Sequence, residues 1–264
     1  MTDYLKELHN DMQTFAQRNG VDIYKVYTSL VDYIAGWMDV TGKPVEGWTF
    51  TAEQNKCFHS MLRKVIQAAG TAMIADSWRD PFGDIFMEYL GNKDMRGQCF
   101  TPESMANLCA RITMDEEMKK PMRMDCGIFE NMIIANDPAC GSGRMLLAAA
   151  RHMELNHNEY IYCIGEDIDT TCVKQTAINL AVHGCYGEVI CHDTLKSPDG
   201  LRFGYIVNEM LYPDRHNRPS LRFSDNPDDF VGVHFWQSQR GKPNEAKEPK
   251  KPVQLTLFDL CQQD

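Results

Sequence analysis

Apolar positions in the first part of the chain follow the spacing of amphipathic helices. One series runs from Leu5 to Phe15 and a second from Val21 to Ile34, with Asn19-Gly20 between them. The turn-forming stretch Thr41-Gly42-Lys43-Pro44 then interrupts the pattern. We therefore predict an N-terminal helical region over residues 1–79.

Residues that favour helix starts predict further helices. Thr51 and Gln54 have the spacing of a capping box, in which each side chain bonds the backbone N–H of the other. Another helix is expected to begin at Asp80-Pro81. Thr101 is expected to cap a helix whose first residue is Pro102, a position where the missing N–H of proline costs nothing.

The pattern changes in the middle of the chain to short apolar runs that are typical of buried strands. These runs are Met132–Ala135, Tyr160–Gly165 and Val189–Cys191, and helix-forming segments separate them. The alternation of strands and helices predicts an α/β fold with a doubly wound, mostly parallel sheet. A fourth strand is expected at Phe203–Val207, and one more short strand between Phe230 and Trp236.

The first of these strands leads into a glycine-rich turn, Asp137-Pro138-Ala139-Cys140-Gly141-Ser142-Gly143. Gly141 and Gly143 allow positive φ angles and place no Cβ in the way of a ligand. The helix that follows begins with free N–H groups and a partial positive charge. Asp137 adds a carboxylate, which suits a cation or an amine and repels a pyrophosphate. The third glycine of a dinucleotide fingerprint is also missing, since Leu146 stands in its place.

Composition and charge narrow the class of protein. No apolar run approaches the ~20 residues of a membrane span, and the N-terminus lacks a signal pattern. The ten cysteines form no C-x-x-C pair, so we expect a reduced, cytoplasmic protein. The cluster of His183, Cys185, Cys191 and His192 matches no familiar zinc spacing, and no metal site is predicted. A net charge of −10 argues against strong autonomous binding to DNA phosphates, which a partner subunit would then provide.

The stretch Asn136–Gly143 resembles motif I of S-adenosylmethionine-dependent methyltransferases. It follows the N/D-P-A-C-G-S-G form of adenine-N6 DNA methyltransferases, especially the modification subunits of type I restriction systems. The resemblance implies a class I methyltransferase fold, S-adenosylmethionine as cofactor and DNA adenine as methyl acceptor, with help from another subunit in DNA binding. The motif I residues implied in cofactor binding are Asp137, Pro138, Ala139, Gly141, Ser142 and Gly143.

An upstream stretch and the end of a later helix match the same family. Cys99-Phe100-Thr101-Pro102 resembles the F/Y-T-P of motif X, which touches the methionine end of the cofactor, so Phe100, Thr101 and Pro102 are expected there. Helix capping by Thr101 is the simpler alternative. Asn179-Leu180 followed by His183-Gly184 is similar to the N-L-x-x-H-G helix ending of type I modification subunits.

Acids after the second and third strands complete the implied cofactor site. Asp167 lies thirty residues after Asp137, and Glu166-Asp167-Ile168-Asp169 is similar to the family's G-x-E/D-I/L-D form. The resemblance implies that Asp167 accepts hydrogen bonds from the ribose hydroxyls and that Ile168 flanks the adenine. Asp193 matches the motif III residue that accepts from the cofactor's exocyclic amine, and a turn-forming role is its alternative.

The resemblance stops before the catalytic segment. Adenine-N6 methyltransferases end their fourth strand in N/D-P-P-Y/F, whose polar groups accept the two amine hydrogens of a flipped-out adenine. Here Asn208-Glu209-Met210-Leu211-Tyr212 follows the strand, so Asn208 is the candidate catalytic residue while both prolines are missing. Three functions stay open: an adenine-N6 DNA methyltransferase, a methyltransferase with another substrate, or a non-catalytic binding protein that acts in DNA metabolism through a partner subunit or the sliding clamp.

The last part of the chain reads as a separate tail. Residues 239–251 are rich in Pro, Lys and Glu and are expected to be disordered. The sequence after them looks like the Q-L-x-L-F peptide that docks on bacterial sliding clamps. Its matching residues are Gln254, Leu255, Leu257 and Phe258. We therefore predict a helical region over 1–79, a cofactor-binding domain over 80–237 and a tail over 238–264.

Overall fold

The computed structural model describes residues 4–43, 48–74, 78–90, 99–119, 121–124, 129–196, 200–209 and 219–234. Its α-helices are α1 (Tyr4–Asn19), α2 (Ile23–Met38), α3 (Ala52–Ile74), α4 (Pro81–Ile85), α5 (Glu103–Glu117), α6 (Arg144–His157) and α7 (Thr170–Val182). Its strands are β1 (Ile133–Asp137), β2 (Ile161–Asp167), β3 (Tyr186–Cys191), β4 (Phe203–Val207) and β5 (Leu221–Ser224). The π-helix η1 (Phe86–Leu90) continues α4, and the short 3-10 helices are η2 (Thr194–Lys196) and η4 (Pro227–Asp229).

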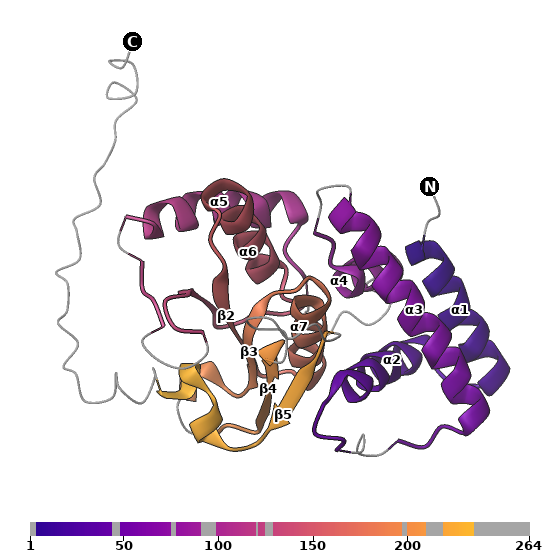
Figure 1. Cartoon of the computed structure of the whole chain (residues 1–264). Helices are drawn as coiled ribbons and strands as arrows, with labels where there is room; N and C mark the ends of the chain where they lie inside the picture. Colours follow the sequence, from indigo (N-terminus) through magenta and orange to yellow (C-terminus); the bar gives the residue numbers. More distant parts are fainter. Residues whose placement is uncertain are drawn as a thin grey trace, which may run out of the picture.

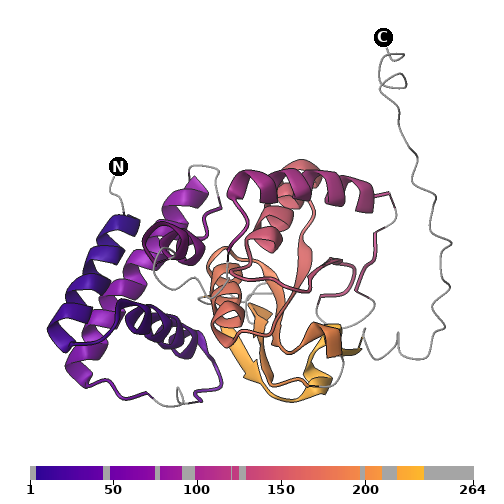
Figure 2. The ribbon, with the colours of Figure 1, turned by 180° about the vertical axis from the view of Figure 1, so that it is seen from behind.

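The N-terminal helices form one group beside the α/β part of the molecule (Figure 1). The view from behind shows α1, α2 and α3 on the same side of the sheet region (Figure 2). Residues of these helices and of the sheet belong to one continuous buried core. Lys174 on α7 pairs with Asp32 on α2 at 2.6 Å, so charge as well as apolar contact joins the two parts. The predicted helical region is therefore confirmed.

The sheet has five strands in the order β1-β2-β3-β4-β5. β1, β2 and β3 are parallel, and α6 and α7 connect them on one face. β4 pairs antiparallel with β3, and β5 antiparallel with β4. The stretch between β3 and β4 is too short for the helical crossover that a parallel neighbour requires. The α/β fold is confirmed, and the sheet is mixed.

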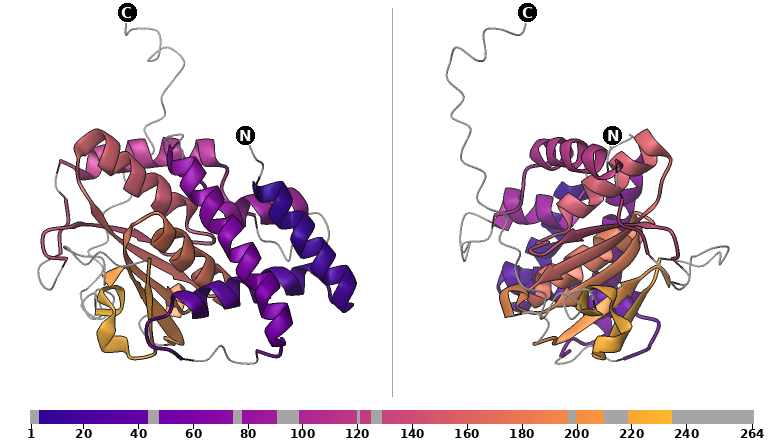
Figure 3. Two further views of the ribbon diagram at one scale, coloured as in Figure 1. Left: turned by 45° about the vertical axis from the view of Figure 1, so that its right-hand side comes forward. Right: turned by 90° about the vertical axis from the view of Figure 1, so that its left-hand side faces the viewer.

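The second face of the sheet carries short segments in the described part of the chain. Met124, Phe129 and Met132 cover Tyr162 and Ile164 near the start of β2. Phe230 and Val233 cover Ile190 and Ile206 on the antiparallel side in the same way. Figure 3 shows the long helices gathered on the other side of the strands. The sheet therefore separates a helix-covered face from a face covered by turns.

Both outer strands of the sheet have a hydrogen-bonded neighbour. On β1, Ile134 N donates to Met122 O at 2.9 Å. On β5, Val40 N donates to Leu221 O at 2.8 Å, and Phe223 N donates to the carboxylate of Asp39 at 3.1 Å. The end of α2 therefore continues directly into a cap on the edge of the sheet.

One predicted helix start has the cap that its sequence indicates, and another does not. Thr51 Oγ1 accepts from Gln54 N at 3.3 Å, and Gln54 Oε1 accepts from Thr51 N at 2.8 Å, which confirms the capping box. Pro102, however, is itself the N-cap of α5, and no side chain caps this helix. The prediction of Thr101 as the cap is wrong, because the helix begins one residue later than expected.

The end of the described chain differs from the predicted strand. The strand predicted from Phe230 onward is wrong, since η4 leads into a helical turn over residues 231–234. Trp236 lies outside the described residues, as do Gln254, Leu255, Leu257 and Phe258, so the clamp peptide stays a prediction. Among the described residues, no helix is long and apolar enough to cross a bilayer. All eight cysteines that the structure describes are free thiols.

Candidate functional site

The turn after β1 has the backbone that its glycines predict. Gly141 has φ +56° and Gly143 has φ +86°, both in the left-handed region where a side chain is strained. Gly143 N donates to Cys140 O at 2.7 Å and closes the turn. Asp137 Oδ1 accepts from Ala139 N at 3.1 Å, so the carboxylate folds back over the start of the turn. α6 begins immediately after Gly143.

Side chains of helix α7 hold this turn in place. Thr176 Oγ1 donates to Gly141 O at 2.9 Å. A Cβ at Gly143 would lie only 2.9 Å from Thr176 Cγ2, so glycine is needed there for close approach as well as for φ. Asn179 Nδ2 donates to Ser142 O at 2.8 Å. Two side chains of one helix therefore hydrogen-bond two consecutive turn residues and pack closely against the third.

Asp167 joins the end of β2 to the same turn. Its Oδ2 accepts from Gly141 N at 2.9 Å, and its Oδ1 accepts from Asp169 N at 2.9 Å. Each carboxylate oxygen has two lone pairs, so both oxygens keep capacity for another donor. The side chain is half-buried, while the neighbouring Ile168 is 61% exposed. The end of β2 therefore presents a fixed carboxylate beside an open apolar surface.

Acidic side chains gather at this edge of the sheet. Burial raises the pKa of Asp137 above its ordinary value, and the neighbouring Asp167 and Glu166 add to the effect. Burial likewise raises the pKa of Asp167, against hydrogen bonds from the backbone of Asp169 and Gly141 that lower it. Carboxylates that cost free energy to ionise side by side are stabilised by a cation placed between them. The edge therefore suits a positively charged ligand.

Glu166 lies on the second face of the sheet and is fully buried. Its Oε1 accepts from Asn136 Nδ2 at 2.7 Å, and its Oε2 lies 2.5 Å from His192 Nε2. Asn136 lies in β1, Glu166 lies in β2, and His192 directly follows β3. The network lies directly behind the acidic edge and ties the three parallel strand ends together.

The segment after β3 reaches the same place. Thr194 Oγ1 donates to Pro138 O at 2.9 Å, which links this segment to the turn after β1. Asp193 is half-buried, accepts from Leu195 N at 3.2 Å and pairs with Lys196 at 3.2 Å. The alternative that Asp193 stabilises a turn is therefore seen, and its carboxylate still lies at the common edge.

The stretch before α5 folds back onto the turn across forty residues of sequence. A Cβ on Gly141 would lie 3.1 Å from Phe100 Cδ1, so the buried Phe100 ring rests against this glycine. Arg144, the first residue of α6, donates to Thr101 O at 3.1 Å. Thr101 and Pro102 themselves are exposed beside it. The structure thus brings the three upstream residues to the glycine turn.

Asp80 connects several of these elements, although no motif in the sequence marks it as a site residue. Asp80 is 2% exposed and caps α4 by accepting from Gly83 N at 2.8 Å. It also accepts from Asn179 Nδ2 at 2.7 Å and from the hydroxyl of Ser142, and it pairs with Arg144 at 3.2 Å. The helix-ending pattern at Asn179 was the one available signal for this contact.

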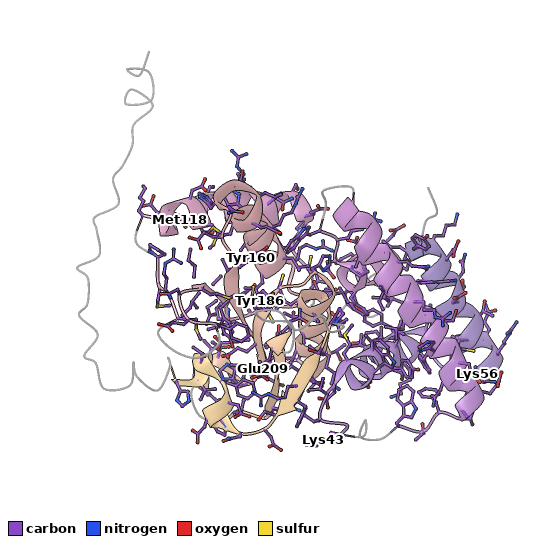
Figure 4. All side chains as sticks on the ribbon, in the orientation of Figure 1. Lys43, Lys56, Met118, Tyr160, Tyr186 and Glu209 are labelled. Atoms are coloured by element: carbon purple, nitrogen blue, oxygen red, sulfur yellow. The ribbon has the colours of Figure 1, made fainter. Side chains whose placement is uncertain are left out.

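Asn208 does not join the site. Val207 pairs with Gly187 at the start of β3, whereas Asp167 pairs with Cys191 at its end. Because β4 runs antiparallel, its last residue lies at the opposite edge of the sheet from the glycine turn. Tyr186 and Glu209 mark that edge in Figure 4.

Both polar atoms of the Asn208 side-chain amide hydrogen-bond backbone groups of the fold. Its Nδ2 donates to Ala181 O at 3.0 Å and to Cys185 O at 2.8 Å, and its Oδ1 accepts from Ser220 N at 3.1 Å. The residue is fully buried and has φ +57°. Position and hydrogen bonding thus tie the Asn208 side chain to the fold, and they give no support to the prediction that it orients a target adenine.

Comparison with known proteins finds a relative in sequence and a similar solved structure. The chain is 26% identical over 189 residues to the type I restriction enzyme MjaVII methylase subunit of Methanocaldococcus jannaschii, covering 69% of this chain. The match spans only 30% of that relative's length. A solved structure from Listeria monocytogenes, described as a candidate class I S-adenosylmethionine-dependent methyltransferase, covers 91% of this chain and 70% of its own, with 14% identity and a TM-score of 0.46.

A family match agrees with the sequence motifs. Residues 77–228, more than half of the chain, match the family described as N-6 DNA methylase. The matched region begins just before the α4 cap and includes every strand of the sheet. The chain therefore belongs to the N-6 DNA methylase family, whose cofactor is S-adenosylmethionine.

Proposed function

We propose that this chain is the cofactor-binding part of an adenine-N6 DNA methyltransferase, with its cofactor at the carboxyl edge of β1, β2 and β3. The observation that carries the proposal is the bond of Gly141 N to Asp167 Oδ2, which fixes the glycine turn against an acid at the neighbouring strand end. Ligands of such sheets bind outside the carboxyl ends of parallel strands.

The residues at this edge suit the parts of S-adenosylmethionine. Asp167 keeps lone pairs for the ribose hydroxyls, and the exposed Ile168 offers apolar surface to the adenine. In this proposal Asp193 accepts from the exocyclic amine. Asp137 supplies negative charge toward the cationic end, and Phe100 closes the methionine side of the turn. When bound, S-adenosylmethionine supplies a sulfonium-activated methyl group for transfer.

The protein's own contribution is to fix the backbone of the turn and to keep the carboxylates partly out of water. Thr176 and Asn179 already hold the backbone of the turn by hydrogen bonds. A ligand that binds there therefore loses little free energy to ordering the backbone. The half-buried carboxylates of Asp137 and Asp167 attract a cation more strongly than exposed ones would, because less water screens them. No covalent nucleophile is required for direct methyl transfer to an amine.

The acceptor side of the reaction needs groups other than Asn208. A nitrogen that attacks a methyl group must have its hydrogens accepted while its lone pair points at the methyl carbon, and loose placement loses orders of magnitude in rate. We infer that these groups come from outside the described residues. The net charge of −10 indicates that DNA is held with the help of another subunit, as the methylase subunit relative suggests.

Calorimetric titration with S-adenosylmethionine tests the cofactor site. Asp167→Ala removes the carboxylate that we propose accepts hydrogen bonds from the two ribose hydroxyls. We expect the affinity of the protein for S-adenosylmethionine to fall about a hundredfold. Asp225→Ala, which removes an exposed carboxylate far along the chain, should leave the affinity unchanged. Equal binding by wild type and Asp167→Ala would show that the cofactor does not use this edge.

Labelled cofactor with adenine-containing DNA tests the reaction itself. Incorporation into N6 of adenine, by the chain alone or with added subunit, is the expected result. Binding without any incorporation under both conditions would leave the cofactor site standing and overturn methyl transfer, so the two parts of the proposal fail separately.

A further inference from the structure

Two histidines and one aspartate converge at the ends of α5 and α6. His152 Nε2 lies 2.7 Å and His157 Nε2 lies 2.9 Å from the same oxygen, Asp115 Oδ1. One ligand atom from each residue lies within 4.8 Å of the other two. Asp115 lies 37 positions before His152 and 42 positions before His157, so the packing of the two helices creates the cluster.

The arrangement and burial of these groups favour cation binding. Asp115 Oδ1 faces Nε2 of both imidazoles, so one carboxylate oxygen and two ring nitrogens can share one ion. The side chains of His152 and His157 are 10% and 24% exposed, which limits their motion, while that of Asp115 is 56% exposed and open to entry from water. Two imidazoles and one carboxylate form a donor set typical of zinc and its neighbours rather than of magnesium or calcium.

A contact behind His152 helps to hold its ring. Asn156 Nδ2 lies 3.1 Å from His152 Nδ1 and donates to His152 O at 2.9 Å. The carbonyl of His152 accepts from the same amide nitrogen, so this contact restrains the ring with Nε2 directed at Asp115.

We propose that Asp115, His152 and His157 bind one divalent transition-metal ion, of which Zn²⁺ is the type, with water completing the coordination. Bond lengths near 2.0 Å in tetrahedral geometry place ligand atoms about 3.3 Å apart, so the cluster opens by about half an ångström to admit the ion. An exposed carboxylate on the last turn of α5 allows that movement.

The site serves structure, not methyl transfer. α6 begins at the glycine turn and ends at His157, and its 14 residues place the cluster about 20 Å from the turn. The ion joins the last turn of α5, the helix that follows Phe100, to the last turn of α6. It therefore fixes the two helices that frame the cofactor edge, through their far ends.

Titration of chelator-treated full-length protein with ZnCl₂ and with CoCl₂ tests this site. We expect one ion per chain, a rise in the unfolding temperature with added metal, and a Co²⁺ absorption spectrum of nitrogen and oxygen ligands. His152→Ala and Asp115→Asn should each weaken binding at least ~tenfold. Asp115→Asn keeps an oxygen that accepts from both imidazoles, so it tests charge and coordination with the helix packing preserved.

Matched controls distinguish this site from chance binding. Glu116→Gln alters the neighbouring carboxylate, which pairs with the exposed Lys119, and His59→Ala removes a histidine on α3. Both should bind as wild type does. Thiolate charge-transfer bands, affinity unchanged in His152→Ala, or no binding at micromolar Zn²⁺ would each overturn the proposal.

Discussion

The parallel and antiparallel halves of the sheet use polar residues at their strand ends in opposite ways. At the ends of β1 and β2, Asp137 and Asp167 are half-buried and keep hydrogen-bonding capacity toward solvent. At the end of β4, Asn208 is fully buried and all its polar groups bond the backbone. The difference follows from strand direction, because β4 ends at the opposite edge.

This comparison teaches how a motif can mislead. A polar residue at the end of a strand has the sequence of a functional residue in both halves. Only the strand's direction decides whether its side chain faces a ligand or fills the fold. Polar residues at a strand end therefore become functional candidates after the topology is known, and not before.

The largest expected effect comes from removing the buried side chain that supports the glycine turn in the parallel half. Asp80→Ala deletes a buried carboxylate that accepts from Gly83 N, Asn179 Nδ2 and the hydroxyl of Ser142, and it leaves Arg144 with one fewer partner. We expect the free energy of unfolding to fall by about 3–5 kcal/mol, measured by urea unfolding. Asp225→Ala, which loses only an exposed ion pair with Lys43, should cost below ~0.5 kcal/mol. Similar costs for both variants would refute the buried network.

The strand shared by both halves gives a pH test. Burial raises the pKa of Glu188 on β3 from an ordinary value of 4.5 to about 7, even though Tyr162, Val231 and Gly232 donate to it. Because the folded protein holds this proton more tightly, the associated stability is present below about pH 4.5 and is lost as the pH rises through about 7.

The expected loss is up to ~3 kcal/mol in the free energy of unfolding between those pH values. Urea unfolding of wild type and Glu188→Gln at pH 5 to 8 measures it. The variant lacks the titration, so its curve should be flatter, whatever constant difference in stability the substitution brings. Parallel curves for the two proteins would mean that Glu188 titrates near its ordinary pKa.

Asn208 gives the sharpest test of the two roles, with the smallest expected effect. Asn208→Ala should lower the free energy of unfolding by about 2 kcal/mol, because the N–H of Ser220 and two buried carbonyls lose their partner. Affinity for S-adenosylmethionine should stay at the wild-type value under conditions where the variant is folded. A large loss of affinity with unchanged stability would reverse the assignment.

Much of the parallel half could be predicted from sequence because its signals are local. The strand, glycine turn and helix lie within about twenty-five residues, and the capping box at Thr51 spans only four. Asp169 also caps α7 as its position suggests, accepting from Thr171 N at 2.7 Å. Such features depend on backbone geometry that neighbouring residues determine.

The remainder depended on contacts between distant residues. Asp80 meets Ser142 and Asn179 across 62 and 99 positions, and no spacing rule connects them. The direction of β4 follows from a short connection whose length mattered more than any motif in it. β5 was missed because its Leu221–Ser224 segment is too short to show an alternating pattern. The metal-ligand spacing rules equally miss a cluster assembled from two helices.

The caps on the two outer strands bear on how the protein behaves in a crowded solution. A bare strand edge invites neighbouring molecules to stack on it and grow into fibrils. Here Met122 already occupies the hydrogen-bonding side of β1 at Ile134, and Val40 with the carboxylate of Asp39 occupies that of β5. The Asp39 carboxylate at the edge of the sheet also disfavours the approach of a strand from another molecule. The end of α2 therefore limits self-association through this edge.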